Sequence, residues 1–326
     1  MSTTRPGNIE RRPSRSRAGR RLCAAILAAA LLASVAGALD QSPQNQSPES
    51  TGLRRFQPGV HIDWQRRAVL ADAHVVLREG PIEFAACFAG KEHESILRFD
   101  ATATHVYMAL GLIGLEPGHP PRWDEQAQRF TPPAGDPVDV TMEWEQDGHR
   151  HEAPLFAWIR QVEYGRQAFD RPWIFAGSQP RPDGTLSAEH IGDGIAVVDK
   201  PDALLALSRN HVSHDAELWA CANTATIPPL QTRVRLVFRA ARPRTHNLRL
   251  DFRGDVYVND RYTTPEDAAD LLLLARRAGT TGVFEVRTER TLKADLLRIK
   301  QTFEDAGLPP DATRFVPISE SPTSQP

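Results

Sequence analysis

The feature that most constrains the fold is a succession of short strand-like runs over residues 56–240, separated by glycine, proline and aspartate. In the clearest run, 138–144, apolar and polar side chains alternate strictly, and Gln146-Asp147-Gly148 follows as a hairpin turn. Such alternation is typical of a strand buried on one face. Similar runs lie at 68–77, 81–87, 195–198, 217–222 and 233–238. This segment therefore predicts a β-rich domain.

One helix is predicted within this domain, near residues 101–113. Apolar residues spaced at i, i+3, i+4 and i+7 would form its buried face, and they are Val106, Ala109, Leu110 and Ile113. Asp100 or Thr102 can cap its first turn, because short polar side chains accept hydrogen bonds from the free N–H groups there.

Residues 247–318 change character. Thr264-Pro265-Glu266-Asp267 combines a capping hydroxyl, a proline at the first helical position and acids in the first turn. A second helix is predicted from the periodic apolar residues Leu292, Leu296, Ile299 and Phe303. Strand-like runs accompany these two helices at 248–252, 256–258, 283–287 and 314–318. The order of elements is therefore ββαβαβ.

We accordingly predict an α+β fold class. A β-rich N-terminal domain with one clear helix covers residues 56–240, and a small ββαβαβ-type domain covers 246–318. Pro243 lies in the seam between them. Residues 39–55 and 319–326 are rich in polar residues and proline, so we predict a disordered linker and a disordered tail.

The first 38 residues have the pattern of an export signal. Six arginines lie between residues 11 and 21, an apolar run follows at 22–35, and Ala36-Gly37-Ala38 fits a cleavage site. The apolar run is short for a membrane-spanning helix, which needs about 20 residues. A cleaved signal peptide and a retained anchor both remain open. We expect an exported protein, either periplasmic or anchored facing the periplasm, with membrane contact only if 22–39 is retained.

The charge distribution excludes one class of partner. The whole chain has a formal charge of −2, and residues 1–38 carry seven arginines and one glutamate, a charge of +6. The remainder therefore carries −2 − 6 = −8. An acidic body lacks the basic surface that nucleic acid binding requires, so we expect no nucleic acid partner.

Removal of residues 1–38 would leave two cysteines, Cys87 and Cys221. Export to an oxidising compartment permits a disulfide between them. Two buried thiols that pack as small apolar side chains are the alternative. The sequence leaves both open.

Several motifs over residues 57–240 resemble the YdjY-domain family of bacterial exported proteins. They are Gly80–Cys87, Gly90–Leu97 with its KEHESIL run, Trp173–Ser178, and Asn223-Thr224 followed by Ile227-Pro228-Pro229. The family has no established function, and some members are labelled ferredoxin-like. An iron–sulfur cluster needs about four cysteine thiolates, so we expect none here. Neither a nucleotide nor a haem is expected.

The C-terminal part resembles the periplasmic domain of the ExbD/TolR family. The resemblance is carried by Gly254–Asn259, the capped helix, the strand at 283–287 and the helix that ends at Glu304–Gly307. It implies that residues 246–318 bind an envelope protein or form a homodimer. That family couples proton flow to envelope work through an acidic residue in its membrane helix. Residues 22–39 contain no Asp or Glu, so a motor role is not implied.

The run Lys91-Glu92-His93-Glu94 supplies the candidate catalytic residues. His93 could act as a base or ligand, oriented by Glu92 or Glu94. Cys87 and His105 are expected neighbours, which makes Cys87, His93 and His105 the candidate metal ligands. The alternative is a charged turn at a sheet edge with no site. A weaker metal candidate set is His211, His214 and Asp215.

Two functions follow from these patterns. The first is a non-catalytic binding or interaction protein of the cell envelope, because no complete catalytic constellation is recognisable. The second is a metal- or thiol-dependent protein or enzyme that uses Cys87, His93, Glu94 and His105.

Overall fold

The computed structural model describes residues 52–126, 128–211 and 218–318, all within one compact unit, 48–326. The predicted export signal, most of the predicted linker, the predicted tail, His214 and Asp215 lie outside the described residues. No helix among the described residues has the length and apolarity needed to cross a membrane.

Eight strands pair edge to edge into a closed ring, because the last strand of the series also pairs with the first. In ring order they are β3 (Ala68–Val75), β18 (Arg233–Ala240), β10 (Pro137–Gln146), β14 (Trp173–Phe175), β16 (Leu205–Ala206), β15 (Ile195–Ala196), β4 (Phe84–Cys87) and β5 (Ser95–Phe99). β3 closes the ring because it is long enough to share one edge between two partners. Its residues Ala68–Ala71 pair with β2 (Val60–Asp63), and Ala73–Val75 pair with β5.

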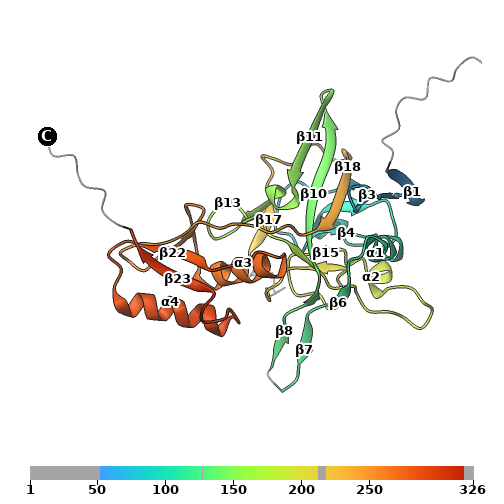
Figure 1. Ribbon diagram of the computed structural model, residues 1–326. Helices are drawn as coiled ribbons and strands as arrows, with labels where there is room; N and C mark the ends of the chain where they lie inside the picture. Colours follow the sequence, from blue (N-terminus) through green and yellow to red (C-terminus); the bar gives the residue numbers. More distant parts are fainter. Residues whose placement is uncertain (1–51, 127, 212–217, 319–326) are drawn as a thin grey trace, which may run out of the picture. The chain divides into compact units, whose positions relative to one another are not determined.

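Two hairpins extend this sheet. β1 (Leu53–Gln57) pairs with β2, and β11 (His149–Pro154) pairs with the far half of β10. The turn of the second hairpin is Asp147-Gly148, both with positive φ, as a two-residue hairpin turn requires. Figure 1 shows β10 and β11 as one long green hairpin.

Large aromatic residues fill the core of the ring. Phe156 and Trp173 stack with ring centroids 4.7 Å apart, and both are buried. α1 (Ala103–Leu112) packs against β2 and β3 and buries Val106, Ala109 and Leu110, as the spacing predicted. Thr102 caps α1, with its hydroxyl accepting from the His105 N–H at 3.3 Å.

Short elements complete this part of the chain. They are η1 (Glu92–Glu94), η2 (Leu155–Trp158), α2 (Ser187–Ile191), the pairs β6 (Pro117–His119) with β9 (Ala134–Gly135) and β7 (Arg122–Asp124) with β8 (Arg129–Thr131), and the small sheet of β13 (Arg166–Gln167), β12 (Ile159–Gln161) and β17 (Ala220–Ala222).

The C-terminal residues form a five-stranded sheet with two helices, coloured orange to red in Figure 1. In sheet order the strands are β21 (Arg261–Thr263), β20 (Val256–Val258), β19 (Leu248–Leu250), β22 (Phe284–Thr288) and β23 (Thr313–Pro317). α3 (Pro265–Arg277) begins at the predicted cap, where the Thr264 hydroxyl accepts from the Asp267 N–H at 3.1 Å. α4 (Lys293–Asp305) buries Ile299 and Phe303.

The predicted fold class is wrong. The described chain is dominated by strands, and its main body is a closed ring of eight strands rather than a β-rich half of an α+β protein. The C-terminal part is not of ββαβαβ type, because a third strand, β21, precedes its first helix. The ring escaped prediction because neighbouring strands in it can lie far apart in the chain: Asp72 on β3 bonds Arg235 on β18, 163 positions away.

Candidate functional site

The run Lys91–Glu94 occupies η1 and the residue before it, beside the start of β4. Lys91 Nζ lies 2.9 Å from Glu94 Oε1. Glu92 instead pairs with Arg98 at 2.9 Å and accepts from the Gly90 N–H. The His93 side chain is 74% exposed, and its ring approaches only the Glu94 carboxylate, at 3.9 Å. The four candidate catalytic residues therefore do not converge on one point.

A cluster of lysines and carboxylates does form around Phe84. Lys200 pairs with Glu83, and both Lys91 Nζ and Lys200 Nζ lie over the Phe84 ring, at 5.9 and 5.4 Å from its centroid. Burial alone would raise the pKa of Glu94, but hydrogen bonds with Lys91 and Glu83 outweigh it, so the pKa is lowered. We call Glu83, Lys91, Glu94, Asp193 and Lys200 the acid–lysine cluster.

Asp193 is the most buried member of the cluster, with 4% exposure. Burial raises its pKa to about 6, and the charges of Lys200 and Lys91 only partly offset that effect. Asp193 lies between two glycines that pack closely against the backbone. A Cβ at Gly192 would lie 2.8 Å from the carbonyl oxygen of Ala89, and a Cβ at Gly194 would lie 2.3 Å from that of Ala86.

The candidate metal ligands are not brought together. Cys87 is buried, and burial raises the pKa of its thiol to about 11, against a hydrogen bond with Ser95 that lowers it. His105 lies on α1 with a buried Nδ1 that has no hydrogen-bond partner in the described chain. No three histidine, cysteine or carboxylate side chains among the described residues are placed to hold a metal ion. Cys87 and Cys221 are both free buried thiols, not a disulfide.

His211, from the weaker candidate set, stacks on Trp219 with ring centroids 4.9 Å apart. Burial lowers its pKa to about 4, helped by the charges of Arg171 and Arg209. It is therefore a neutral packing residue at physiological pH.

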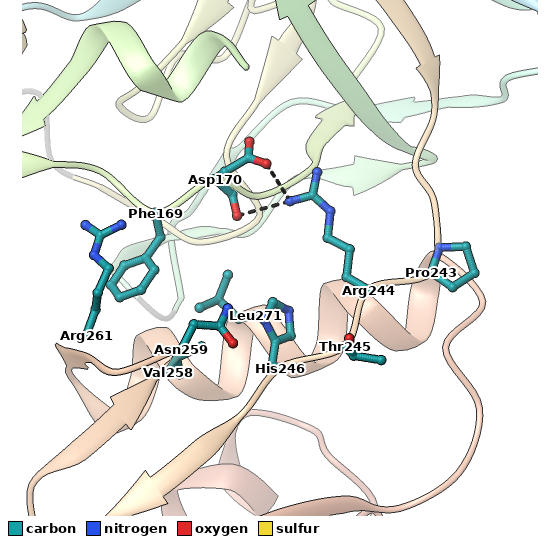
Figure 2. A pocket seen from close by; sticks show the side chains of 10 residues that line it. All are labelled: Phe169, Asp170, Pro243, Arg244, Thr245, His246, Val258, Asn259, Arg261 and Leu271. Carbon is teal, nitrogen blue, oxygen red and sulfur yellow. Dashed lines mark hydrogen bonds and ion pairs between the residues drawn. The ribbon is translucent and has the colours of Figure 1, made fainter. Parts of the chain in front are cut away.

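A cavity of about 510 Å³ lies where the segment before β14 meets the C-terminal sheet, and the sequence did not predict it. We call it the junction cavity. Figure 2 shows its lining, from Phe169, Asp170, Pro243, Arg244, Thr245, His246, Val258, Asn259, Arg261 and Leu271. Its lining spans four separate chain segments, so no local motif marks it. One of these segments, 243–246, includes Pro243, which lies in the predicted seam between the two domains.

The ring and the C-terminal sheet are held together beside this cavity by a buried ionic network. Arg171 donates to Asp270 at 3.0 Å and lies 3.6 Å from Asp267. Arg209 pairs with Asp267 at 2.7 Å, and the Ser208 hydroxyl donates to Asp270 at 2.8 Å. Both acids lie in the first half of α3. Phe169 is part of the apolar core of the C-terminal sheet.

At one end of the junction cavity, the charge of an arginine is balanced by two carboxylates. Arg244 donates to Asp139 at 2.6 Å and to Asp170 at 3.0 Å, the latter drawn in Figure 2. Burial raises the pKa of Asp170, and Arg244 opposes that shift. Burial lowers the pKa of His246 to about 4, with Arg244 adding to the effect. His246 is thus neutral near pH 7, and its buried Nδ1 has no hydrogen-bond partner in the described chain.

The other end carries a positive charge. The Arg261 guanidinium lies over the Phe169 ring at 4.2 Å and donates to the Gln167 carbonyl. Burial lowers the pKa of Arg261, and the nearby charge of Arg166 lowers it further. Arg166 in turn donates to the Tyr262 carbonyl and lies over the Tyr164 ring at 4.8 Å.

The described fold is thus a closed strand ring and a smaller sheet within one compact unit, with a polar cavity between them. The YdjY domain family matches residues 60–239. The chain belongs to this family, and the match ends before the C-terminal sheet begins. No curated protein and no solved structure matches the chain. Nothing in these comparisons supports the resemblance of residues 246–318 to the ExbD/TolR family.

Proposed function

We propose that this chain is an exported, non-catalytic binding protein that holds a small-molecule ligand in the junction cavity. The cavity itself carries the proposal. Its volume of about 510 Å³ falls within the range of roughly 300–1,000 Å³ found for ligand sites. His246 lines the cavity and is neutral near pH 7, so its ring can contact a ligand there.

The surroundings of the cavity favour binding without large rearrangement. The pairs Arg171–Asp270 and Arg244–Asp139 fix the two walls against each other. A preformed site avoids the entropy cost of ordering loops when the ligand arrives. The lining also argues for binding rather than catalysis, because the lowered pKa of His246 makes its ring a weak base and the carboxylate of Asp170 is already paired with Arg244.

Export is proposed from the sequence of residues 1–38, with its basic, apolar and small-residue segments in order. N-terminal sequencing of the protein recovered from fractionated cells tests it. A chain that starts at Leu39 in the periplasmic fraction supports a cleaved signal. A chain with an intact N-terminus in the cytosolic fraction contradicts export.

Ligand binding is tested on the full chain by thermal unfolding in the presence of amino acids, dicarboxylates, sugar phosphates and sugars. Thr245 lines the cavity and is exposed at its rim, so Thr245→Trp should fill it. Thr281→Trp is the matched control on an exposed loop outside the lining. We expect at least one compound to raise the melting temperature of the wild type and of Thr281→Trp but not of Thr245→Trp. Equal shifts in all three proteins, or none in the wild type, would refute the proposal.

We also propose that residues 246–318 contact an envelope partner or a second copy of the chain. The resemblance to the ExbD/TolR family supports this role. Two exposed leucines also support it: Leu292, which caps α4 and is 67% exposed, and Leu297, which lies within α4 and is 57% exposed. Light scattering of the full chain, beside Leu297→Glu, provides the test. A concentration-dependent dimer weakened by Leu297→Glu supports self-association. A wild type that stays monomeric and captures no protein from its own membranes argues against any contact.

A further inference from the structure

Arg166 and Arg261 form a reciprocal pair. Arg166 lies on β13 and donates to the carbonyl of Tyr262 on β21, while Arg261 lies on β21 and donates to the carbonyl of Gln167 on β13. Each guanidinium is also held over an aromatic ring, of Tyr164 or Phe169. Two strands from distant parts of the sequence thus hold two positive charges close together.

No ion pair balances either charge within the described residues. Both arginines bond only backbone carbonyls and rings, in contrast to Arg244 and Arg171, which each contact two carboxylates. Two uncompensated like charges repel each other, and burial of Arg261 increases the cost. Such an arrangement costs free energy in the unliganded protein and is relieved when an anion binds.

The remaining donors suit a planar or tetrahedral anion. A guanidinium has five N–H donors in a fixed fork, and the carbonyl bond of Arg261 uses only part of them. Such forks match carboxylate and phosphate oxygens bidentately. In Figure 2 Arg261 and Phe169 lie at one end of the junction cavity, and Asp170 lies between Phe169 and Arg244. The Asp170 carboxylate is bonded to Arg244, so its charge is already compensated by a residue other than Arg261.

We propose that the ligand of the junction cavity carries an anionic group, a carboxylate or a phosphate, and that Arg261 binds this group with Arg166 reinforcing the local positive potential. The inference rests on the proposed function, because it assigns the chemical class of ligand to the same cavity. The two can fail separately, since a neutral ligand would leave the binding role intact and remove the anion assignment.

Calorimetric titration of the full chain at low ionic strength tests the assignment, with succinate, inorganic phosphate and the neutral analogue succinamide as probes. We expect succinate or phosphate to bind and succinamide to bind at least tenfold more weakly. Tighter binding of phosphate than of succinate points to a phosphate ester, and the reverse order to a carboxylate. Absence of binding by both anions, or binding of succinamide as tight as that of succinate, would overturn the proposal.

Substitutions of the two arginines test where the anion binds. Arg261→Gln should weaken anion binding at least tenfold and Arg166→Gln by less, because of these two arginines only Arg261 lines the cavity. Arg253→Gln is the matched control, an exposed arginine outside the lining that is stacked on Phe252. If Arg261→Gln does not fold, Arg261→Lys takes its place, since it keeps the charge but loses the fork and should show an intermediate loss. Unchanged affinity in a folded Arg261 variant would overturn the assignment.

Discussion

Arg171 and Asp270 form a buried ion pair with 3.0 Å between Nη1 and Oδ2, and it joins the segment before β14 to α3. The two residues are 99 positions apart in the chain. Together with Phe169, which enters the core of the C-terminal sheet, this pair links the strand ring to that sheet within one compact unit.

We predict that Arg171→Met destabilises the chain by about 3–5 kcal/mol, because removal of one partner leaves the other charge buried and uncompensated. Arg171→Met combined with Asp270→Leu should recover part of the loss, since it removes both charges. Urea unfolding measures both. Arg181→Met is the control: it breaks the solvent-exposed contact between Arg181 and Asp183 and should cost less than about 1 kcal/mol. Equal costs for the buried and the exposed variant would contradict the prediction.

Asp193 of the acid–lysine cluster makes a contribution to stability that declines with rising pH. Folded Asp193 has a pKa of about 6 against an ordinary 3.8, so the folded chain keeps a proton that the unfolded chain has released. Its contribution is fully present below about pH 4 and is lost as the pH rises through 6. Asp193→Asn cannot ionise, so between pH 4 and 7 it should lose less stability than the wild type. Urea midpoints across this range test it, with the exposed Asp311→Asn as control.

His211 predicts a pH dependence of opposite sign. Its folded pKa of about 4 lies below the ordinary 6.5, so the unfolded chain takes up a proton first as the pH falls. The stabilisation is fully present above about pH 6.5 and is lost toward pH 4. His211→Asn should lower stability at every pH through lost stacking on Trp219, yet flatten this acid-side slope. His149→Asn, on the exposed strand β11, should leave the slope as it is.

The two described cysteines should be unreactive in the folded chain. Cys87 is buried with a pKa of about 11, so almost none of it is thiolate at neutral pH, and Cys221 is buried as well. Mass spectrometry after iodoacetamide treatment should find both unmodified without urea and both alkylated in urea without a reductant. Alkylation in urea that requires a reductant would reveal a disulfide and contradict the free thiols.

The acid–lysine cluster also shows how far a site can be predicted from sequence. The charged run Lys91–Glu94 indicates a candidate site in the sequence, and two of its residues, Lys91 and Glu94, belong to the cluster. Their partners Glu83, Asp193 and Lys200 could not be named from sequence, because Glu83 reaches the cluster through the pairing of β4 with β5, and Asp193 and Lys200 reach it through the pairing of β4 with β15. His93 looked equally promising in sequence and faces solvent, since η1 gives adjacent side chains different directions.

The sequence by itself determined the elements whose causes are local. The Thr264 cap and Pro265 start α3, the spacing of Val106, Ala109 and Leu110 gives α1 its buried face, and Asp147-Gly148 turns β10 into β11. Only the tertiary structure decided the order of the strands in the ring and the junction cavity. These depend on contacts between residues about 100 positions or more apart, such as Arg171 with Asp270, and no local pattern of side chains records which distant segment will be the partner.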